Sequence, residues 1–220
     1  MTRQYVAILG DVVGSKKIED REDFQNRLQK ACDRVNQAFA KDIYAKIKIT
    51  KGVDEISGIL TKIANVYQMI NMISEDIYPN LMRFTVVYGP LDTALESKDA
   101  AKIDGVAFHK AAELILHLKK TTEFVIVDIG DLLIDRLLIS QMNLVAFLKR
   151  MWTKRQFEVV NLYEKLGNQE EVAKRLKITQ QTVSRIISTA NYDEISKAEQ
   201  SINDALKEYQ EKLLREKTKN

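Results

Sequence analysis

The most informative stretch of the chain is Gln169–Ala190, with the sequence QEEVAKRLKITQQTVSRIISTA. Its apolar residues recur at helical spacing in two short segments, which predicts two helices joined by a tight turn. These residues are expected to form a shared core; they are Val172, Ala173, Leu176, Ile178, Val183, Ile186 and Ile187. The stretch therefore predicts a helix-turn-helix in which Ile178 fills the turn.

The polar residues of this stretch fall on the opposite face. Several lie around the start of the second helix, where recognition helices contact base edges; they are Thr179, Gln180, Gln181, Thr182, Ser184 and Arg185. Lys174 and Arg175 of the first helix are expected to contact phosphates. We therefore expect double-stranded DNA as the partner, and the alternative is a plain helical hairpin used for protein contacts.

Two short motifs carry a resemblance. Gln169–Ala173 fits the pattern Q-x-x-V-A, and Gln180–Ser184 fits Q-x-T-V-S. The segment thus resembles the sigma-factor-like helix-turn-helix of bacterial regulators. It departs from that pattern at Lys177, which occupies a turn position usually held by Gly, so we expect a strained positive φ there.

The basic excess of the chain lies in the same region. From Lys149 to Ala190 there are nine Lys or Arg against four Glu, a local net charge of +5 in a chain of net charge +3. Residues 1–148 hold 19 Lys or Arg and 20 Asp or Glu, so they contribute none of this excess. Such a patch attracts phosphate in a salt-sensitive way.

Length and composition set the outer bounds. With 220 residues, 45% of them hydrophobic, the chain can hold one domain of average size and a smaller one. The single cysteine, Cys32, cannot form an internal disulfide and is expected to be buried. With only two histidines beside it, His109 and His117, no zinc site is expected. No leader or membrane span is recognisable, so we expect a cytoplasmic protein without membrane contact.

The order of elements follows from the spacing of apolar residues. Strands are predicted at 5–9, 43–49, 55–60 and 82–88, and helices from 21 to 39 and from 63 to 73. This β-α-β-β-α-β order is that of a ferredoxin-like α+β domain, an antiparallel sheet with helices on one face. A helix at 104–118, a strand at 123–129 and a long helix at 132–152 are predicted to follow.

The last helix has an apolar stripe along a charged surface. Its members are Ile195, Ala198, Ile202, Ala205 or Leu206, Tyr209 and Leu213. The stripe is too short to predict a coiled coil, so it either packs back on the chain or pairs with a second copy. We favour the second option and expect a homodimer, because a two-fold dimer would place two recognition helices on neighbouring half-sites.

Four motifs in the first half carry a wider resemblance. They are YVAILGDVVGS at 5–15, DEISGIL at 54–60, RFTVVYG at 83–89 and DGVAFHKAAE at 104–113. Together they resemble the SatD family, whose members pair an amino-terminal domain with a carboxy-terminal helix-turn-helix. The amino-terminal domain is similar in turn to the palm of class III nucleotide cyclases and diguanylate cyclases.

The resemblance implies a phosphate and metal site. Asp11 and Asp54 occupy the places of the two carboxylates that hold Mg²⁺ or Mn²⁺ in a palm. Nucleotide phosphates are expected at the loop after the first strand, near the positive end of the following helix. The nucleotide-binding residues are then Gly10, Asp11, Gly14, Ser15 and Lys16.

Two departures weigh against catalysis. Val53 stands where related sequences have the turn glycine of the hairpin, and Ala112 stands where they have an arginine. That cation would stabilise charge developing on the transferred phosphoryl group, and Lys110 or His109 are the nearest substitutes. We therefore expect a DNA-binding regulator whose degenerate palm senses a nucleotide or a metal. The alternatives are an active two-metal nucleotidyl cyclase or transferase tethered to DNA, and a non-catalytic adaptor.

The expected domain organisation follows from these predictions. It comprises a cyclase-like palm at 1–131, a connecting helix at 132–152, a helix-turn-helix domain at 153–192 and an amphipathic helix with a frayed tail at 193–220.

Overall fold

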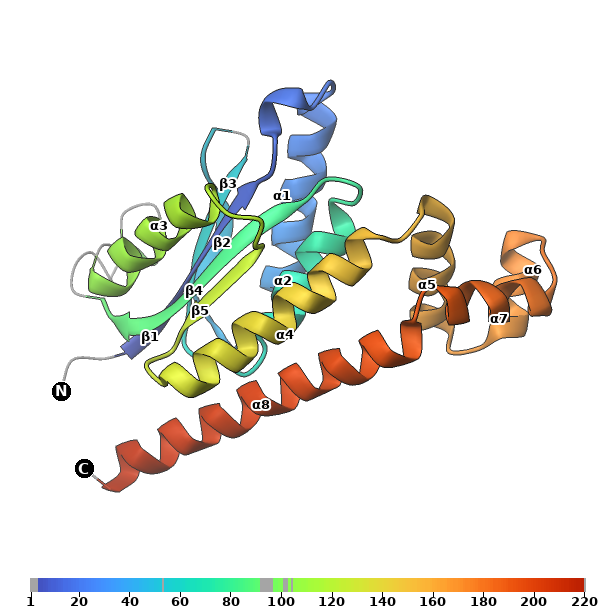
Figure 1. Cartoon of the computed structure of the whole chain (residues 1–220). Helices are drawn as coiled ribbons and strands as arrows, with labels where there is room; N and C mark the ends of the chain where they lie inside the picture. Colours follow the sequence, from blue (N-terminus) through green and yellow to red (C-terminus); the bar gives the residue numbers. More distant parts are fainter. Residues whose placement is uncertain (1–3, 53, 92–96, 101–102, 104, 220) are drawn as a thin grey trace. The chain divides into compact units, whose positions relative to one another are not determined.

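The computed structural model describes residues 4–52, 54–91, 97–100, 103 and 105–219. Within these residues the chain forms a mixed α+β structure with one five-stranded sheet and eight α-helices (Figure 1). Predicted positions Val53 and Asp104 lie outside the described residues.

The strands are β1 (Gln4–Val12), β2 (Ile43–Lys51), β3 (Glu55–Leu60), β4 (Met82–Pro90) and β5 (Val125–Asp128). The α-helices are α1 (Arg21–Ala38), α2 (Val66–Asp76), α3 (Val106–Leu118), α4 (Leu132–Arg150), α5 (Lys154–Leu166), α6 (Gln169–Leu176), α7 (Gln180–Thr189) and α8 (Tyr192–Lys219). A short 3₁₀ helix, η1 (Ser15–Lys17), follows β1. Among the helices of the described residues, none has both the length and the apolar character needed to cross a bilayer.

The sheet has the order β2-β3-β1-β4-β5. β1 is antiparallel to both of its neighbours, and β2 and β3 form an antiparallel hairpin. The first four strands with α1 and α2 therefore confirm the predicted β-α-β-β-α-β order. β5 extends the sheet by pairing parallel to β4, which requires the crossover through α3.

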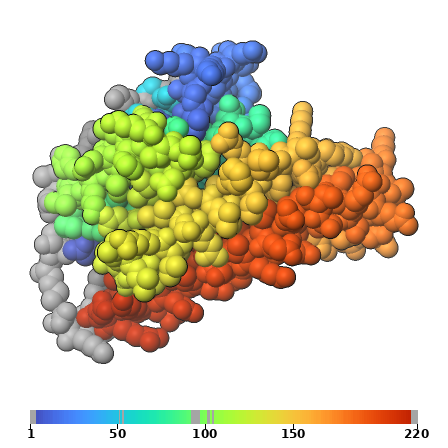
Figure 2. All heavy atoms as spheres, viewed as in Figure 1, coloured from blue at the N-terminus to red at the C-terminus, as the bar shows by residue number. Residues whose placement is uncertain are grey.

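Helices cover both faces of the sheet: α1 and α2 of the β-α-β-β-α-β unit lie together on one face, and α3, which follows this unit, lies on the other. α1 packs on β2 and α2, whereas α3 packs on β1 and β4 from the other side (Figure 1). α3 is held there by its apolar side, on which Ala107 and Ala111 pack in one cluster with Tyr5 and Ala7 of β1. In the space-filling view the yellow-green atoms of α3 form part of the surface of this face (Figure 2).

Two features hold α3 close to the sheet. A Cβ atom on Gly89 of β4 would lie 3.2 Å from the Cβ atom of Ala107, so the absence of a side chain lets the helix approach. One turn further along, the buried hydroxyl of Thr85 donates a hydrogen bond of 3.0 Å to the carbonyl oxygen of Ala111. The end of α3 is thereby placed above the end of β1.

The apolar stripe of α8 is buried within the same chain. Ile195, Ile202 and Leu206 are at most 1% exposed, and Tyr209 is 8% exposed. The Tyr209 hydroxyl also bonds to the carbonyl oxygen of Ile129, just after β5. The prediction that this stripe forms a dimer interface was therefore wrong, because the chain itself covers these side chains.

The chain divides into two compact units. Unit 1 comprises Met1–Ser140 and Ile202–Asn220, and unit 2 comprises Gln141–Ser201. The boundaries thus lie inside α4 and α8, while the domain limits inferred from the sequence remain a prediction.

Unit 2 contains one helix that the sequence patterns did not single out, α5. The predicted long helix ends early, at Arg150, and α5 begins after Thr153, whose side chain forms a capping box with Gln156. Trp152 lies between the two helices and donates a hydrogen bond from its indole nitrogen to the carbonyl oxygen of Ala190, at 2.8 Å. α5 supplies Val159 to the core beneath α6 and α7.

Candidate functional site

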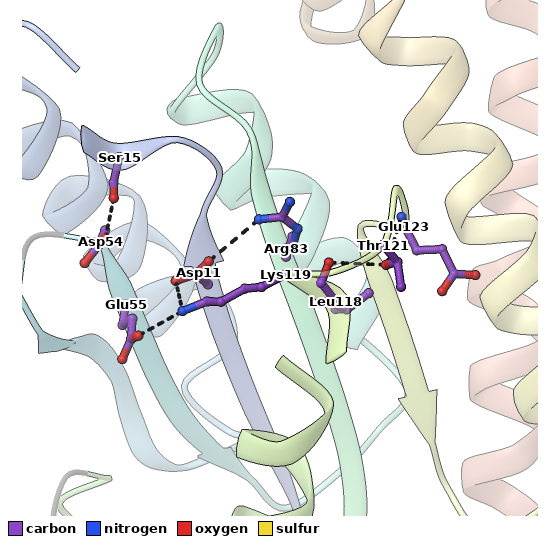
Figure 3. A network of polar contacts seen from close by, with 9 residues as sticks. All are labelled: Asp11, Ser15, Asp54, Glu55, Arg83, Leu118, Lys119, Thr121 and Glu123. Atoms are coloured by element: carbon purple, nitrogen blue, oxygen red, sulfur yellow. Dashed lines mark hydrogen bonds and ion pairs between the residues drawn. The ribbon is translucent and has the colours of Figure 1, made fainter. Parts of the chain in front are cut away.

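One row of side chains crosses three strands at the end of β1. Asp11 of β1 lies opposite Glu55 of β3 on one side and opposite Arg83 of β4 on the other. Because directly paired residues of neighbouring strands project to the same face of a sheet, these three side chains lie together on the face covered by α3 (Figure 3). An Arg83 guanidinium nitrogen lies 3.9 Å from the Asp11 carboxylate.

Lys119 brings a second cation to this row from the end of α3. Its ammonium nitrogen lies 2.9 Å from Asp11 Oδ1 and 3.3 Å from Glu55 Oε1 (Figure 3). The turn that follows is held in place by Thr121, whose hydroxyl donates a hydrogen bond to the carbonyl oxygen of Leu118. Lys119 therefore bridges the two carboxylates from a fixed position.

Asp54 faces a different partner. The hydroxyl of Ser15 donates a hydrogen bond of 2.5 Å to Asp54 Oδ2 (Figure 3). The Asp54 carbonyl oxygen accepts a hydrogen bond of 3.0 Å from the backbone N–H of Val12. The hairpin and the loop after β1 are thus joined to each other through Asp54.

Burial and ion pairing oppose each other in this row, and burial prevails at Asp11 but not at Lys119. Burial raises the pKa of Asp11, and its hydrogen bond and ion pair with Lys119 oppose this rise only in part. For Lys119, burial acts to lower the pKa, but the hydrogen bond and charge of Asp11, followed by those of Glu55, raise it overall. The Lys119 side chain consequently stays a cation at all physiological pH values.

A cleft of about 260 Å³ adjoins the row, between the sheet and α3. Its apolar wall includes Leu9 and Phe108, and Glu55 stands at its edge. Ser57, 3% exposed, also lines it, and among the residues that the structure describes the buried Ser57 hydroxyl has no hydrogen-bond partner. The cleft can therefore receive a small, mostly apolar group that also forms a hydrogen bond.

The structure explains the departure at Ala112. Ala112 lines the cleft, and the cation reaches the carboxylates from Lys119, seven residues further along. Seven residues are about two helical turns, so both positions lie on the same side of α3. Lys110, one expected substitute, instead pairs with Asp128. Sequence reasoning missed both Lys119 and Arg83; the spacing of seven residues from Ala112 was the available signal for Lys119, whereas Arg83 follows only from the strand register.

The carboxylates do not fit a divalent metal ion in this arrangement. Oxygen ligands for Mg²⁺ or Mn²⁺ must point at one centre, whereas Asp11 is engaged by Lys119 and Asp54 by Ser15. In the described ranges, moreover, no group of three or more His, Cys, Asp or Glu side chains is placed to hold a metal.

The loop predicted for nucleotide phosphates is only partly suited to them. Gly14 has a φ of 66° with open space around it, and Lys16 is exposed. Gly10, in contrast, serves packing, because a Cβ there would lie 2.8 Å from an Ile56 side-chain atom. The next long helix, α1, is already capped by the Asp20 carboxylate, which opposes a second anion at that helix end.

Unit 2 presents the second candidate surface, on α6 and α7. The predicted core is confirmed: Val172 and Val183 are fully buried, and Leu176, Ile178 and Ile186 pack around them. The turn between the helices contains Lys177 with a φ of 53°, as expected from the missing glycine. Thr179 caps α7 by accepting a hydrogen bond from the N–H of Thr182.

The residues predicted to contact DNA lie on the outside of this pair. Most are exposed, and Thr182 is half-buried; the exposed ones are Lys174, Arg175, Thr179, Gln180, Gln181, Ser184 and Arg185. Gln180 also donates a side-chain hydrogen bond of 2.8 Å to Gln169 of α6. A polar surface thus stands on two helices that are fixed to each other.

Comparison with known proteins gives the following. No curated protein matches the chain. Two structures of a bacterial light-regulated adenylyl cyclase each match 58% of this chain, with a TM-score of 0.37. The first is 16% identical to this chain over 43% of its own length, and the second is 14% identical over 76% of its own length. A regulator of polyketide synthase expression from Bifidobacterium adolescentis is 13% identical with a TM-score of 0.28, covering 93% of this chain and 86% of its own.

The family model gives a longer match. The model described as "SatD family" matches residues 5–212, which include the sheet, the row around Asp11 and both α6 and α7. The chain is therefore a member of the SatD family.

Proposed function

We propose that this protein is a DNA-binding regulator that recognises double-stranded DNA through α7, with α6 contacting the backbone. One observation carries the proposal. Four polar side chains in the first half of α7, Gln180, Gln181, Ser184 and Arg185, are exposed, while Val183 and Ile187 of the same helix are at most 5% exposed. A rigid helix with polar groups able to bond to base edges is what major-groove recognition requires.

The charge of the region supports the same proposal. Neither Lys174 nor Arg175 of α6 has an ion pair among the described contacts, and both are exposed. Phosphate attraction by such side chains gives affinity for any sequence, and the α7 side chains then distinguish sequences. In the adaptor alternative the same surface binds a protein. That alternative does not predict that the α6 side chains set the general affinity while the α7 side chains distinguish sequences.

The full chain provides the test. Binding to a pool of duplexes is measured by fluorescence anisotropy at several salt concentrations, and preferred sequences are selected from the pool. Gln181→Ala or Arg185→Ala should reduce discrimination between sequences by about 1–3 kcal/mol per lost base contact. Lys174→Ala or Arg175→Ala should weaken binding to all sequences alike and lower the salt slope by about one unit each.

Lys30→Ala is the matched control, since Lys30 is an exposed lysine on α1 in unit 1. It should leave both the salt slope and the sequence preference unchanged. A folded protein without salt-sensitive affinity for any duplex would exclude DNA binding and favour the adaptor.

Unit 1 is proposed to be the regulatory part, which responds to a small ligand such as a nucleotide. The support is the cleft beside α3 and the Ser57 hydroxyl in it, which has no partner in the described part of the chain, together with the exposed Lys16 and the left-handed Gly14. The alternative of an active two-metal enzyme is less well supported, because Lys119 and Ser15 already engage Asp11 and Asp54. Calorimetry with nucleoside triphosphates, followed by Lys16→Ala and Ser57→Val, tests this role.

A homodimer remains part of the proposal, with an interface other than the α8 stripe. Within unit 1, α4 exposes Leu133 and Leu137, one turn apart and 67% and 60% exposed. Adjacent leucines on a helix are a suitable surface for a second copy of the same helix. Leu137→Asp should lower the mass in solution; an unchanged dimer mass would place the interface elsewhere.

A further inference from the structure

We propose that Lys119 is a built-in cation that takes the place of a divalent metal ion between Asp11 and Glu55. The carboxylate site of unit 1 is then complete without any metal, and Mn²⁺ enters it only when Lys119 is removed. This assignment goes beyond the regulatory role proposed for unit 1 and does not depend on DNA binding.

The geometry supplies the first argument. A single ammonium group contacts both carboxylates, at 2.9 Å from Asp11 and 3.3 Å from Glu55. An ammonium carries three N–H donors, so it can satisfy two carboxylates at once. A metal ion that bridged Asp11 and Glu55 would have to occupy the space that the Lys119 nitrogen now fills.

Charge supplies the second argument. Asp11 and Glu55 contribute two negative charges, and Lys119 and Arg83, which approach Asp11 from α3 and β4, contribute two positive charges. Asp54, a third carboxylate close enough to act on Asp11, adds one more negative charge, so these five groups together carry a net charge of −1. Adding a divalent ion would change this to a net charge of +1 beside a carboxylate that is only 7% exposed, and the ion would repel both Lys119 and Arg83, which is unfavourable in a partly buried site.

The remaining carboxylate, Asp54, is also engaged by the protein itself. Asp54, the second predicted metal ligand, accepts the hydrogen bond of Ser15 and helps hold the loop after β1. Its oxygen would have to give up this bond to join Asp11 on a metal. Each of the three carboxylates is thus already contacted by a hydrogen-bond donor from another side chain of the protein.

The test compares two neighbouring lysines with Mn²⁺ as the probe. Lys119→Met removes the bridging cation, whereas Lys120→Met removes an exposed lysine one position further on. In the full chain, Lys119→Met should bind Mn²⁺ at least about tenfold more tightly than the wild type, because an opposite charge at this range is worth roughly one to three pKa units. Lys120→Met should match the wild type.

A second substitution locates the gained site. Adding Asp11→Asn to Lys119→Met should abolish the gain, measured by calorimetry and by the paramagnetic resonance signal of unbound Mn²⁺. Tight, Asp11-dependent Mn²⁺ binding by the wild type would overturn the proposal, as would the absence of any gain in a folded Lys119→Met protein.

A measurement that leaves Lys119 in place covers the case in which Lys119→Met does not fold. Acetylation of the wild type is followed lysine by lysine, and Lys119 should react several-fold more slowly than Lys120 with or without Mn²⁺. Asp11→Asn should raise its rate toward that of Lys120. Equal rates for the two lysines in the wild type, or a rise at Lys119 on adding Mn²⁺, would contradict the proposal.

Discussion

Tyr209 of α8 donates a hydrogen bond of 2.9 Å from its hydroxyl to the carbonyl oxygen of Ile129, eighty residues earlier in the chain. The ring is 8% exposed, and Lys212, one turn further along α8, forms an ion pair with Asp131 at 3.2 Å. Together these contacts attach the final helix to the end of β5.

Tyr209→Phe should destabilise unit 1 without changing its packing. The substitution removes the hydroxyl and leaves the Ile129 carbonyl without this partner, which typically costs about 1–3 kcal/mol. Urea unfolding followed by circular dichroism measures the change in the free energy of unfolding. Lys207→Ala, at an exposed position on the same helix, should stay close to the wild type. A Tyr209→Phe protein as stable as the wild type would mean that the bond contributes nothing.

The same phenol should make the stability of the protein pH-dependent in alkaline solution. Burial, followed by the charges of Asp131 and Asp135, raises the pKa of Tyr209 to about 12 from its ordinary 10.0. The folded state therefore holds this proton more tightly than the unfolded state. Its stabilising contribution is complete below pH 10 and is lost as the pH rises toward 12.

Thermal midpoints between pH 9 and pH 12 provide the measurement for this effect. Burial also raises the pKa of the Cys32 thiol to about 12, so Cys32 adds a loss of the same sign. The Cys32 contribution cancels when the wild type is compared with Tyr209→Phe. The variant should lose less stability over this range than the wild type, and parallel curves would contradict the assignment.

Two glycines of the sheet should differ in their tolerance of a methyl group. A Cβ on Gly58 would lie 2.5 Å from Ile47 Cγ1 and 3.0 Å from the Ile47 backbone, whereas a Cβ on Gly89 would lie 3.2 Å from Ala107. Gly58→Ala should therefore destabilise unit 1 by about 1–3 kcal/mol, as overpacking does. Gly89→Ala should cost less, because Ala107 needs to move only slightly. Chemical unfolding of the two variants should reproduce this order, and a reversal would show that β2 moves more easily than α3.

Unit 2 offers a matched pair of opposite substitutions. Lys177 ends α6 with a φ of 53°, and Gly167 ends α5 with a φ of 66° and open space around it. Lys177→Gly should stabilise unit 2 by roughly 0.5–1 kcal/mol, and Gly167→Ala should destabilise it by about 1 kcal/mol, since only glycine adopts this conformation without strain. Fluorescence of Trp152, the single tryptophan, reports the unfolding of unit 2 alone. Changes of the same sign in both variants would contradict this explanation.

The parts of the fold that depend on local spacing could be predicted from the sequence. The alternation at Ile43, Ala45 and Ile47 indicated β2, and the helical spacing of Phe24, Leu28 and Cys32 indicated α1; both elements are confirmed. The core of α6 and α7 is confirmed for the same reason, because the apolar spacing within 169–190 indicated its members, whereas the contribution of Val159 from α5 was not predicted.

What could not be predicted depends on contacts between distant residues. The apolar faces of α3 and α8 indicated helices, but the spacing alone could not say what would cover them. Lys119 was missed because its two partners lie on β1 and β3, more than sixty residues away. Asp11 and Asp54 were correctly placed at neighbouring ends of strands, yet their hydrogen-bond partners follow only from the register and from the turn after α3.

The division of the chain into two units has a consequence for folding during translation and for proteolysis. The polypeptide leaves unit 1 at Ser140, completes unit 2, and returns to unit 1 only at Ile202. On the ribosome, unit 2 therefore has all of its residues before unit 1 receives the segment that carries Tyr209. A stop codon or a protease cut after Ser201 would remove the last part of unit 1 and leave unit 2 whole, so no single break in the chain can release both units intact.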